Sequence, residues 1–117
     1  MQPQDSVTIA PSVLITIVEH AATQVKGVAS IGTLPVDARR WLRGNTMGAG
    51  VALEIDGNSV SAELYLVLNP EAVMRTVSIK TQQAVKRAIE ELVGMEVKHI
   101  NVHIENVDFL ASGQSSI

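Results

Sequence analysis

Two histidines and a glutamate near the end of the chain are the side chains best suited to bind a metal ion. His99, His103 and Glu105 lie in the alternating run VKHINVHIENV, where a strand would place all three on one face. Along a strand the two histidines would lie about 13 Å apart, at about 3.3 Å per residue, whereas a zinc ion holds each nitrogen at about 2 Å. They therefore cannot chelate one ion, and His103 with Glu105 could do so only with help from a neighbouring strand. We expect no metal site and interpret these side chains as solvated.

The densest positive charge lies in the segment Arg39-Arg40-Trp41-Leu42-Arg43, which also holds the only tryptophan. Guanidinium groups form paired hydrogen bonds with carboxylates and phosphates, and an indole ring stacks or anchors at interfaces. We interpret Arg39, Arg40, Trp41 and Arg43 as a candidate partner-contact site. The alternative is that Trp41 and Leu42 pack against a sheet edge while the arginines are solvated.

The glycine-rich run GNTMGAG at residues 44–50 does not match a nucleotide-binding loop. Such a loop needs a strand, then glycines, then a helix that begins with Lys-Ser or Lys-Thr, and here a strand is predicted to follow. The chain has no cysteine, no G-x-S-x-G motif and no H-E-x-x-H motif. We therefore expect no catalytic residue, no cofactor and no enzymatic activity.

A helix followed by a strand is predicted for residues 73–109, the part around which the chain is organised. Apolar residues recur at helical spacing, Gly94 follows where a left-handed cap favours glycine, and strict alternation then begins. In the strand, Ile100, Val102 and Ile104 are predicted to face the helix. The predicted apolar stripe of the helix comprises Val73, Val77, Ala84, Val85, Ala88, Ile89, Leu92 and Val93.

The first half predicts a strand at residues 7–9, a helix that begins at Pro11 and ends before Gly27, and a weak strand at 28–31. Asp56-Gly57-Asn58 predicts a hairpin turn between two alternating runs. The predicted stripe of this helix comprises Val13, Leu14, Ile17, Val18, Ala21, Ala22 and Val25. The inward residues of the second hairpin strand are predicted to be Val60, Ala62, Leu64, Leu66 and Leu68.

These elements predict an α+β fold, a two-layer sandwich with two long helices on one face of a mixed four- to five-stranded sheet, in the order β-α-β-β-β-α-β. We expect a flexible lead at residues 1–6, a single domain at 7–109 with an irregular loop at 32–50, and a flexible tail at 110–117. The other sheet face is predicted to be uncovered and polar, with Glu54, Glu63, Tyr65, His99, Asn101, His103 and Glu105.

Composition narrows the classes of partner. The net charge of −3 gives no general attraction to nucleic acid or anionic lipid, and 117 residues suit one domain with an aliphatic core. No stretch approaches the roughly 20 apolar residues that span a bilayer, and the first residues lack the pattern of a signal peptide. With no cysteine in the chain, we expect a soluble protein of a reducing, cytoplasmic compartment.

Three segments in a fixed order resemble the alkaline shock protein family of bacterial envelope stress response proteins. They are VTIAPSVLITIVEHAATQVKGVASI, GVALEIDGNSVSAELYLVL and VSIKTQQAVKRAIEELVGMEVKHINVHIENVDF, which together span about residues 7–109. The signatures are Val25-Lys26-Gly27-Val28 and the run from Gly94 through Asn101-Val102-His103-Ile104 to Val107. The family often has a Tyr-Gly pair where this chain has Asn69-Pro70-Glu71.

The resemblance implies a small non-enzymatic protein that is cytoplasmic, associates with itself and in some members is recruited to the membrane by an anchored protein partner. It implies no catalytic residue. We therefore expect an interaction or scaffold protein that forms homo-oligomers through the open sheet face or a sheet edge. The alternative is a small nucleic-acid-binding α+β module. The acidic charge and the single aromatic residue on the predicted open face, Tyr65, argue against that alternative.

Overall fold

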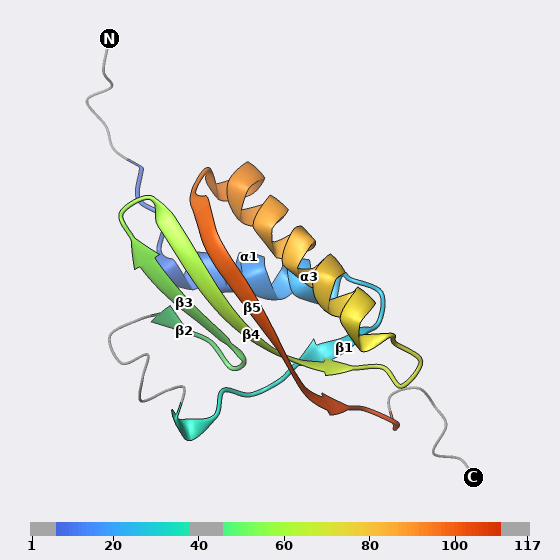
Figure 1. The fold of residues 1–117 in the computed structure, drawn as a ribbon. Helices are drawn as coiled ribbons and strands as arrows, with labels where there is room; N and C mark the ends of the chain where they lie inside the picture. Colours follow the sequence, from blue (N-terminus) through green and yellow to red (C-terminus); the bar gives the residue numbers. More distant parts are fainter. Residues whose placement is uncertain (1–6, 38–45, 111–117) are drawn as a thin grey trace.

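The computed structural model describes residues 7–37 and 46–110, and it shows two helices on one face of a five-stranded sheet (Figure 1). The elements are α1 (Pro11–Thr23), β1 (Val28–Ile31), β2 (Thr46–Met47), β3 (Val51–Asp56), β4 (Ser59–Leu68), α3 (Met74–Ala88), the π-helical turn η1 (Ile89–Val93) and β5 (Glu96–Val107). The predicted α+β, two-layer fold is confirmed. The predicted order is wrong at one point, because residues 7–9 form no strand and the short β2 lies instead in the connection predicted to be irregular.

Strand β4 is the centre of the sheet. On one side β5 runs parallel to it along its whole length, from the pair Ser59 and Glu96 to the pair Leu68 and Val107. On the other side two strands share its edge, with β3 antiparallel to its first part and β1 antiparallel to its last part. Because neighbouring parallel strands need a long crossover, α3 connects β4 to β5 and packs against the sheet on the way. Among the described residues, β5 is therefore the outermost strand on this side of the sheet.

The alternating residues of β4 form the floor of the core, as predicted. Each is at most 1% exposed: Val60, Ala62, Leu64, Leu66 and Leu68. Ile100 of β5 is buried in the same cluster, and Val102 and Ile104 pack against it. The helices close the core from above with Leu14, Ile15, Val18 and Ala22 of α1, and Val77, Val85 and Ile89 of α3 and η1.

The predicted helix stripes were partly wrong, because the contacts between elements set how each helix is rotated. Val13 is 45% exposed, whereas Ile15, which the predicted stripe left out, is buried. Val73 precedes α3 and is 66% exposed. Thr81 of α3 is fully buried, and its hydroxyl donates a 2.8 Å hydrogen bond to the Val77 carbonyl, which removes most of the cost of burying it.

The end of the second helix departs from the α-helical pattern at η1. A π-helical turn holds more residues than an α-turn, so the 3.6-residue periodicity slips and Leu92 turns outward, 73% exposed. Gly94 then caps the helix in the left-handed conformation, φ 80°, and its N–H donates to the Ile89 carbonyl at 3.0 Å. The predicted glycine cap is confirmed, whereas the predicted burial of Leu92 is wrong.

Candidate interaction site

A network of polar side chains joins β4 and β5 on the sheet face away from the helices. The parallel register places Glu63 beside Asn101 and Tyr65 beside His103. One carboxylate oxygen of Glu63 accepts a 2.7 Å hydrogen bond from the Asn101 amide, and the other lies 2.7 Å from Nε2 of His103. The rings of Tyr65 and His103 stack with centroids 4.4 Å apart and planes inclined by 10°.

The side chains of this network use most of their hydrogen-bonding and stacking capacity on one another. Both oxygens of Glu63 and one face of the His103 ring are engaged within the chain. Burial raises the pKa of Tyr65, and the nearby charge of Glu63 raises it further. The cluster therefore holds the two strands in register, and it leaves Tyr65 with one ring face already stacked.

Part of this face is covered, which corrects the prediction of a fully open surface. The segment after β1 crosses it, with the Gly32 N–H bonded to the Tyr65 carbonyl at 2.7 Å and the Leu34 N–H bonded to the Ala49 carbonyl at 2.8 Å. The side chain of Leu34 is buried against Ala52, next to Tyr65. A small apolar cluster therefore lies under this segment, on the face predicted to be polar and uncovered.

Glu105 anchors the crossing segment. Its carboxylate accepts hydrogen bonds from the Thr33 hydroxyl and the Thr33 N–H, each 2.7 Å long. The hydroxyl bond and then the N–H bond lower the pKa of Glu105, because both favour the charged carboxylate. The glutamate singled out as a possible metal ligand is thus used to attach a loop.

The three residues first considered for metal binding are not brought together. His103 is paired with Glu63, Glu105 with Thr33, and His99 lines a separate hollow beside α3. Among residues 7–37 and 46–110, no group of three or more histidine and acidic side chains is arranged to hold a metal ion. The other candidate site, Arg39, Arg40, Trp41 and Arg43, lies outside the described residues.

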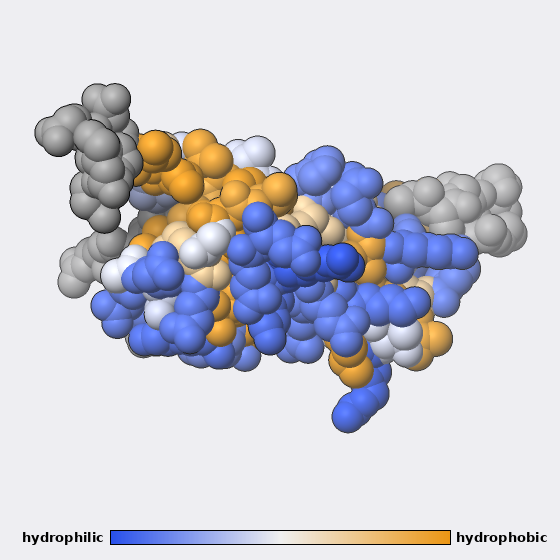
Figure 2. Space-filling model, turned by 90° about the horizontal axis from the view of Figure 1, so that it is seen from above, coloured by the Kyte–Doolittle hydropathy of each residue, from blue (hydrophilic) through white to orange (hydrophobic). Residues whose placement is uncertain are grey.

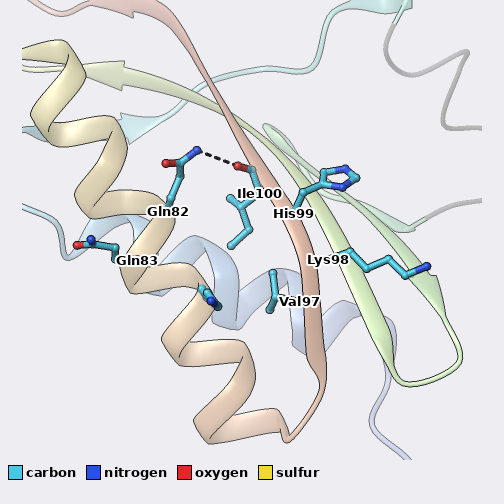
Figure 3. A pocket seen from close by; sticks show the side chains of 7 residues that line it. Gln82, Gln83, Val97, Lys98, His99 and Ile100 are labelled. Carbon is cyan, nitrogen blue, oxygen red and sulfur yellow. Dashed lines mark hydrogen bonds between the residues drawn. The ribbon is translucent and has the colours of Figure 1, made fainter.

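The outer edge of β5 and the neighbouring face of α3 form a hollow that the sequence did not predict (Figure 3). Its volume is about 280 Å³, and its lining is Gln82, Gln83 and Lys86 from α3 with Val97, Lys98, His99 and Ile100 from β5. Figure 3 shows Val97 and Ile100 directed toward the helix and the hydrogen bond from the Gln82 amide to the Ile100 carbonyl, 2.9 Å long. The Gln82 contact could have been suspected only from its place beside the apolar stripe of α3.

Large apolar side chains are also exposed on the helical layer. Val7, Ile9 and Val13 lie at and before the start of α1, and Leu92 lies in η1, which contacts α1. Figure 2 shows apolar residues gathered on one part of the face seen from above. Single exposed apolar residues are common, but contiguous patches are typical of interaction surfaces.

Comparison with known proteins gives a family model match over residues 1–109, to the alkaline shock protein 23 family, described as having a cell envelope-related function. An uncharacterised protein of Streptococcus pyogenes serotype M6, Spy1535, is 31% identical over 102 residues, which cover 86% of this chain and 78% of that protein. The uncharacterised protein YqhY of Bacillus subtilis strain 168 is 24% identical over 109 residues, covering 92% of this chain and 81% of that one.

Solved structures with a similar fold include several forms of the MamM CTD. One variant aligns with a TM-score of 0.54 and 14% identity over 85% of this chain and 100% of that one. A zinc form aligns with a TM-score of 0.53 and 14% identity over 90% and 91% of the two chains. At this level of identity the likeness shows the fold alone.

Proposed function

The chain belongs to the alkaline shock protein 23 family, which has a cell envelope-related function, and we propose that it serves there as a non-enzymatic interaction or scaffold protein. It would act by associating with itself and by binding partner proteins. The observation that carries the proposal is the outer side of β5. In the described residues β5 pairs only with β4, so a strand of twelve residues lies at the edge of the sheet beside a hollow. Edge strands present unpaired N–H and C=O groups, to which another strand can pair.

The exposed apolar residues near the start of α1 support the partner-binding part of this proposal. Ile9 and Val13 are both exposed there, and Leu92 is exposed on η1, which contacts α1. Burying such side chains against another protein removes apolar surface from water, which favours association.

We also propose that the protein is cytoplasmic and that it reaches the envelope through a membrane-anchored protein partner. Within residues 7–37 and 46–110, no helix has the length and apolar character needed to cross a bilayer. The zinc form of the MamM CTD gives no argument for a metal in this chain, because a fold likeness at 14% identity does not carry over a ligand set.

Size-exclusion chromatography with light scattering tests self-association. We expect a mass that is a multiple of the 12.5 kDa chain and that rises with protein concentration. A strict monomer at high concentration would contradict this part of the proposal. Filter binding with a salt titration tests the alternative of a nucleic-acid-binding module, because phosphate contacts produce a steep salt dependence.

Membrane co-sedimentation from native lysate tests the anchored partner. The protein should sediment with membranes, and neutralising Arg39, Arg40 and Arg43 should release it if that segment is the contact. Replacement of Arg75, an exposed arginine at the start of α3, is the control for a change in charge elsewhere. Equal recovery of the unaltered protein, the arginine-segment variant and the Arg75 control in the membrane fraction would show that the arginine segment does not make the contact.

A further inference from the structure

We propose that β5 pairs antiparallel with β5 of a second copy of the chain, about a two-fold axis that passes through Val102. The proposal rests on the self-association proposed above and names the surface that would carry it. Its first support is the direction of the backbone at this edge. The Ile100 carbonyl accepts its hydrogen bond from Gln82 of α3, so it points away from β4 and toward the outer side of β5.

The alternation of backbone direction along a strand identifies the other N–H and C=O groups at this edge. Residues two apart on a strand share a side-chain face and present their N–H and C=O groups to the same edge. Val102 and Ile104 therefore point their backbone groups outward as Ile100 does. These three residues supply the groups that a second strand would need.

The sequence of β5 is nearly symmetric in polarity about Val102. An isologous two-fold interface requires that residue i meet residue j while j meets i, so a symmetric strand suits it. The run VKHINVHIENV has apolar residues at both ends, at its centre and two positions to either side of the centre. The matched positions, taken outward from Val102, are Asn101 with His103, Ile100 with Ile104, His99 with Glu105, Lys98 with Asn106, and Val97 with Val107.

The irregularities of β5 lie on either side of the proposed axis. Its pairing with β4 shifts register twice, between Val97 and His99 and between Ile104 and Asn106. Lys98 and Glu105 are the extra residues at these two bulges, and they lie four and three positions from Val102. The regular part of β5, residues 99–104, thus contains the proposed axis.

Side-chain chemistry agrees with this register on both faces. On the polar face, His99 would lie opposite Glu105 of the second copy, and a histidine N–H can donate to a carboxylate. Asn101 would lie opposite His103, and both side chains would keep their bonds to Glu63 of their own chain. On the helical face, Ile100 would lie opposite Ile104 of the second copy. The next pair beyond Val97 and Val107 would set Glu96 opposite Asp108, two like charges, so we expect pairing to end there.

In the proposed dimer, side chains of the second copy would occupy the hollow beside α3. It is lined by Val97 and Ile100, whose counterparts in the second copy are Val107 and Ile104. The side chains of those two residues would enter the hollow under α3 and cover its apolar floor. On the open sheet face, by contrast, Glu63, Tyr65 and His103 already engage one another.

The cysteine-free chain allows a direct test by engineered disulfides. Position 102 would lie opposite itself across the axis, so Val102→Cys should give a disulfide-linked dimer under mild oxidation. Positions 101 and 103 would form a closer pair, so a mixture of Asn101→Cys and His103→Cys should cross-link more than either variant alone. Lys98→Cys is the control, because two such residues would lie about 26 Å apart, at about 3.3 Å per residue.

We expect roughly tenfold more cross-linked dimer from Val102→Cys than from Lys98→Cys, since a disulfide needs Cα atoms within about 7 Å. Circular dichroism of each variant shows that it is folded. If light scattering shows oligomers but Val102→Cys cross-links no better than Lys98→Cys, this pairing is overturned and the proposed function still stands. The edge of β5 would then be open to another occupant, such as an extended peptide of another protein. A strict monomer at every concentration would overturn both.

Discussion

The side-chain amide of Gln82 donates a 2.9 Å hydrogen bond to the main-chain carbonyl of Ile100, and so joins one flank of α3 to the outer edge of β5. In the single chain this bond satisfies a carbonyl that would otherwise face the hollow. In the proposed dimer the same carbonyl would accept from the backbone of Ile104 in the second copy. Gln82 therefore competes with the strand pairing.

The first prediction concerns this competition. Gln82→Ala should lower the free energy of unfolding of the monomer by about 1 kcal/mol, the net value of one hydrogen bond. The proposed dimer lacks the Gln82 bond, so the substitution destabilises only the monomer. Self-association should therefore become stronger by up to about fivefold. Light scattering over a dilution series and denaturant unfolding measure the two effects. Gln83→Ala, which changes a neighbouring residue of the same hollow, is the control, and weaker association of Gln82→Ala would contradict the competition.

The second prediction concerns the network on the polar face. Glu63→Ala removes the carboxylate that binds both Asn101 and His103, and it should lower the free energy of unfolding by about 1–2 kcal/mol, less than a fully buried charged pair would lose. Urea unfolding measures the change. Glu54→Ala, which changes an exposed glutamate of β3, should alter stability by no more than about 0.5 kcal/mol. Equal effects of the two substitutions would show that the network adds nothing.

The third prediction concerns Tyr65. Because it is the only tyrosine in the sequence, the phenolate absorbance of the protein reports the ionisation of this one side chain. The pKa of Tyr65 is raised, first by burial and then by Glu63, so the folded state favours the neutral ring. Its contribution to stability is present below the unfolded pKa of about 10 and is lost as pH rises through the higher folded pKa. In Glu63→Gln the pKa of Tyr65 should move down toward its ordinary value, and a pKa that does not move would exclude the charge of Glu63 as a cause.

The fourth prediction concerns the acid side of the stability profile. The pKa of Glu105 is lowered by its bonds to the Thr33 hydroxyl and N–H. Its contribution to stability is present above the unfolded carboxyl pKa of about 4.3 and is lost as pH falls through the lower folded pKa. Thr33→Val keeps the N–H bond and removes the hydroxyl bond, so the fall in stability below about pH 4.3 should become shallower. Urea unfolding at several pH values on both sides of that pKa measures the profile, and a profile unchanged by the substitution would show that the hydroxyl bond is unimportant.

The fifth prediction concerns Gly50, where β1 and β3 meet along β4. A Cβ atom at this position would lie 2.5 Å from the Gly32 carbonyl oxygen, which is main chain and cannot rotate away. Gly50→Ala should therefore destabilise the fold by about 1–3 kcal/mol, the cost of overpacking. Gly57→Ala is the contrasting variant. Among the described residues beyond its two chain neighbours, no atom lies within 4 Å of a Cβ there, so the positive φ of 61° is what opposes the change. Thermal unfolding of the two variants separates steric crowding from backbone strain.

Local pattern was enough to predict the parts of the fold that depend on near neighbours. The inward side chains of the second hairpin strand, β4, were predicted correctly, because a period of two assigns every residue to a face once one face is buried. The cap at Gly94 was also predicted correctly, since its requirement is the conformation of one residue. The strand predicted at residues 7–9 failed because, among the described residues, no neighbouring strand pairs with it.

Alternation, the two helices and the family resemblance were determined by the sequence itself, because each depends on the order and spacing of residues along the chain. Only the tertiary structure decided that β5 lies parallel to β4, which brings Glu63 to His103 across 40 positions of sequence. It also decided that Leu34 covers Ala52 and that Gln82 meets Ile100. These contacts depend on strand register and helix rotation, and the packing of the whole core selects both.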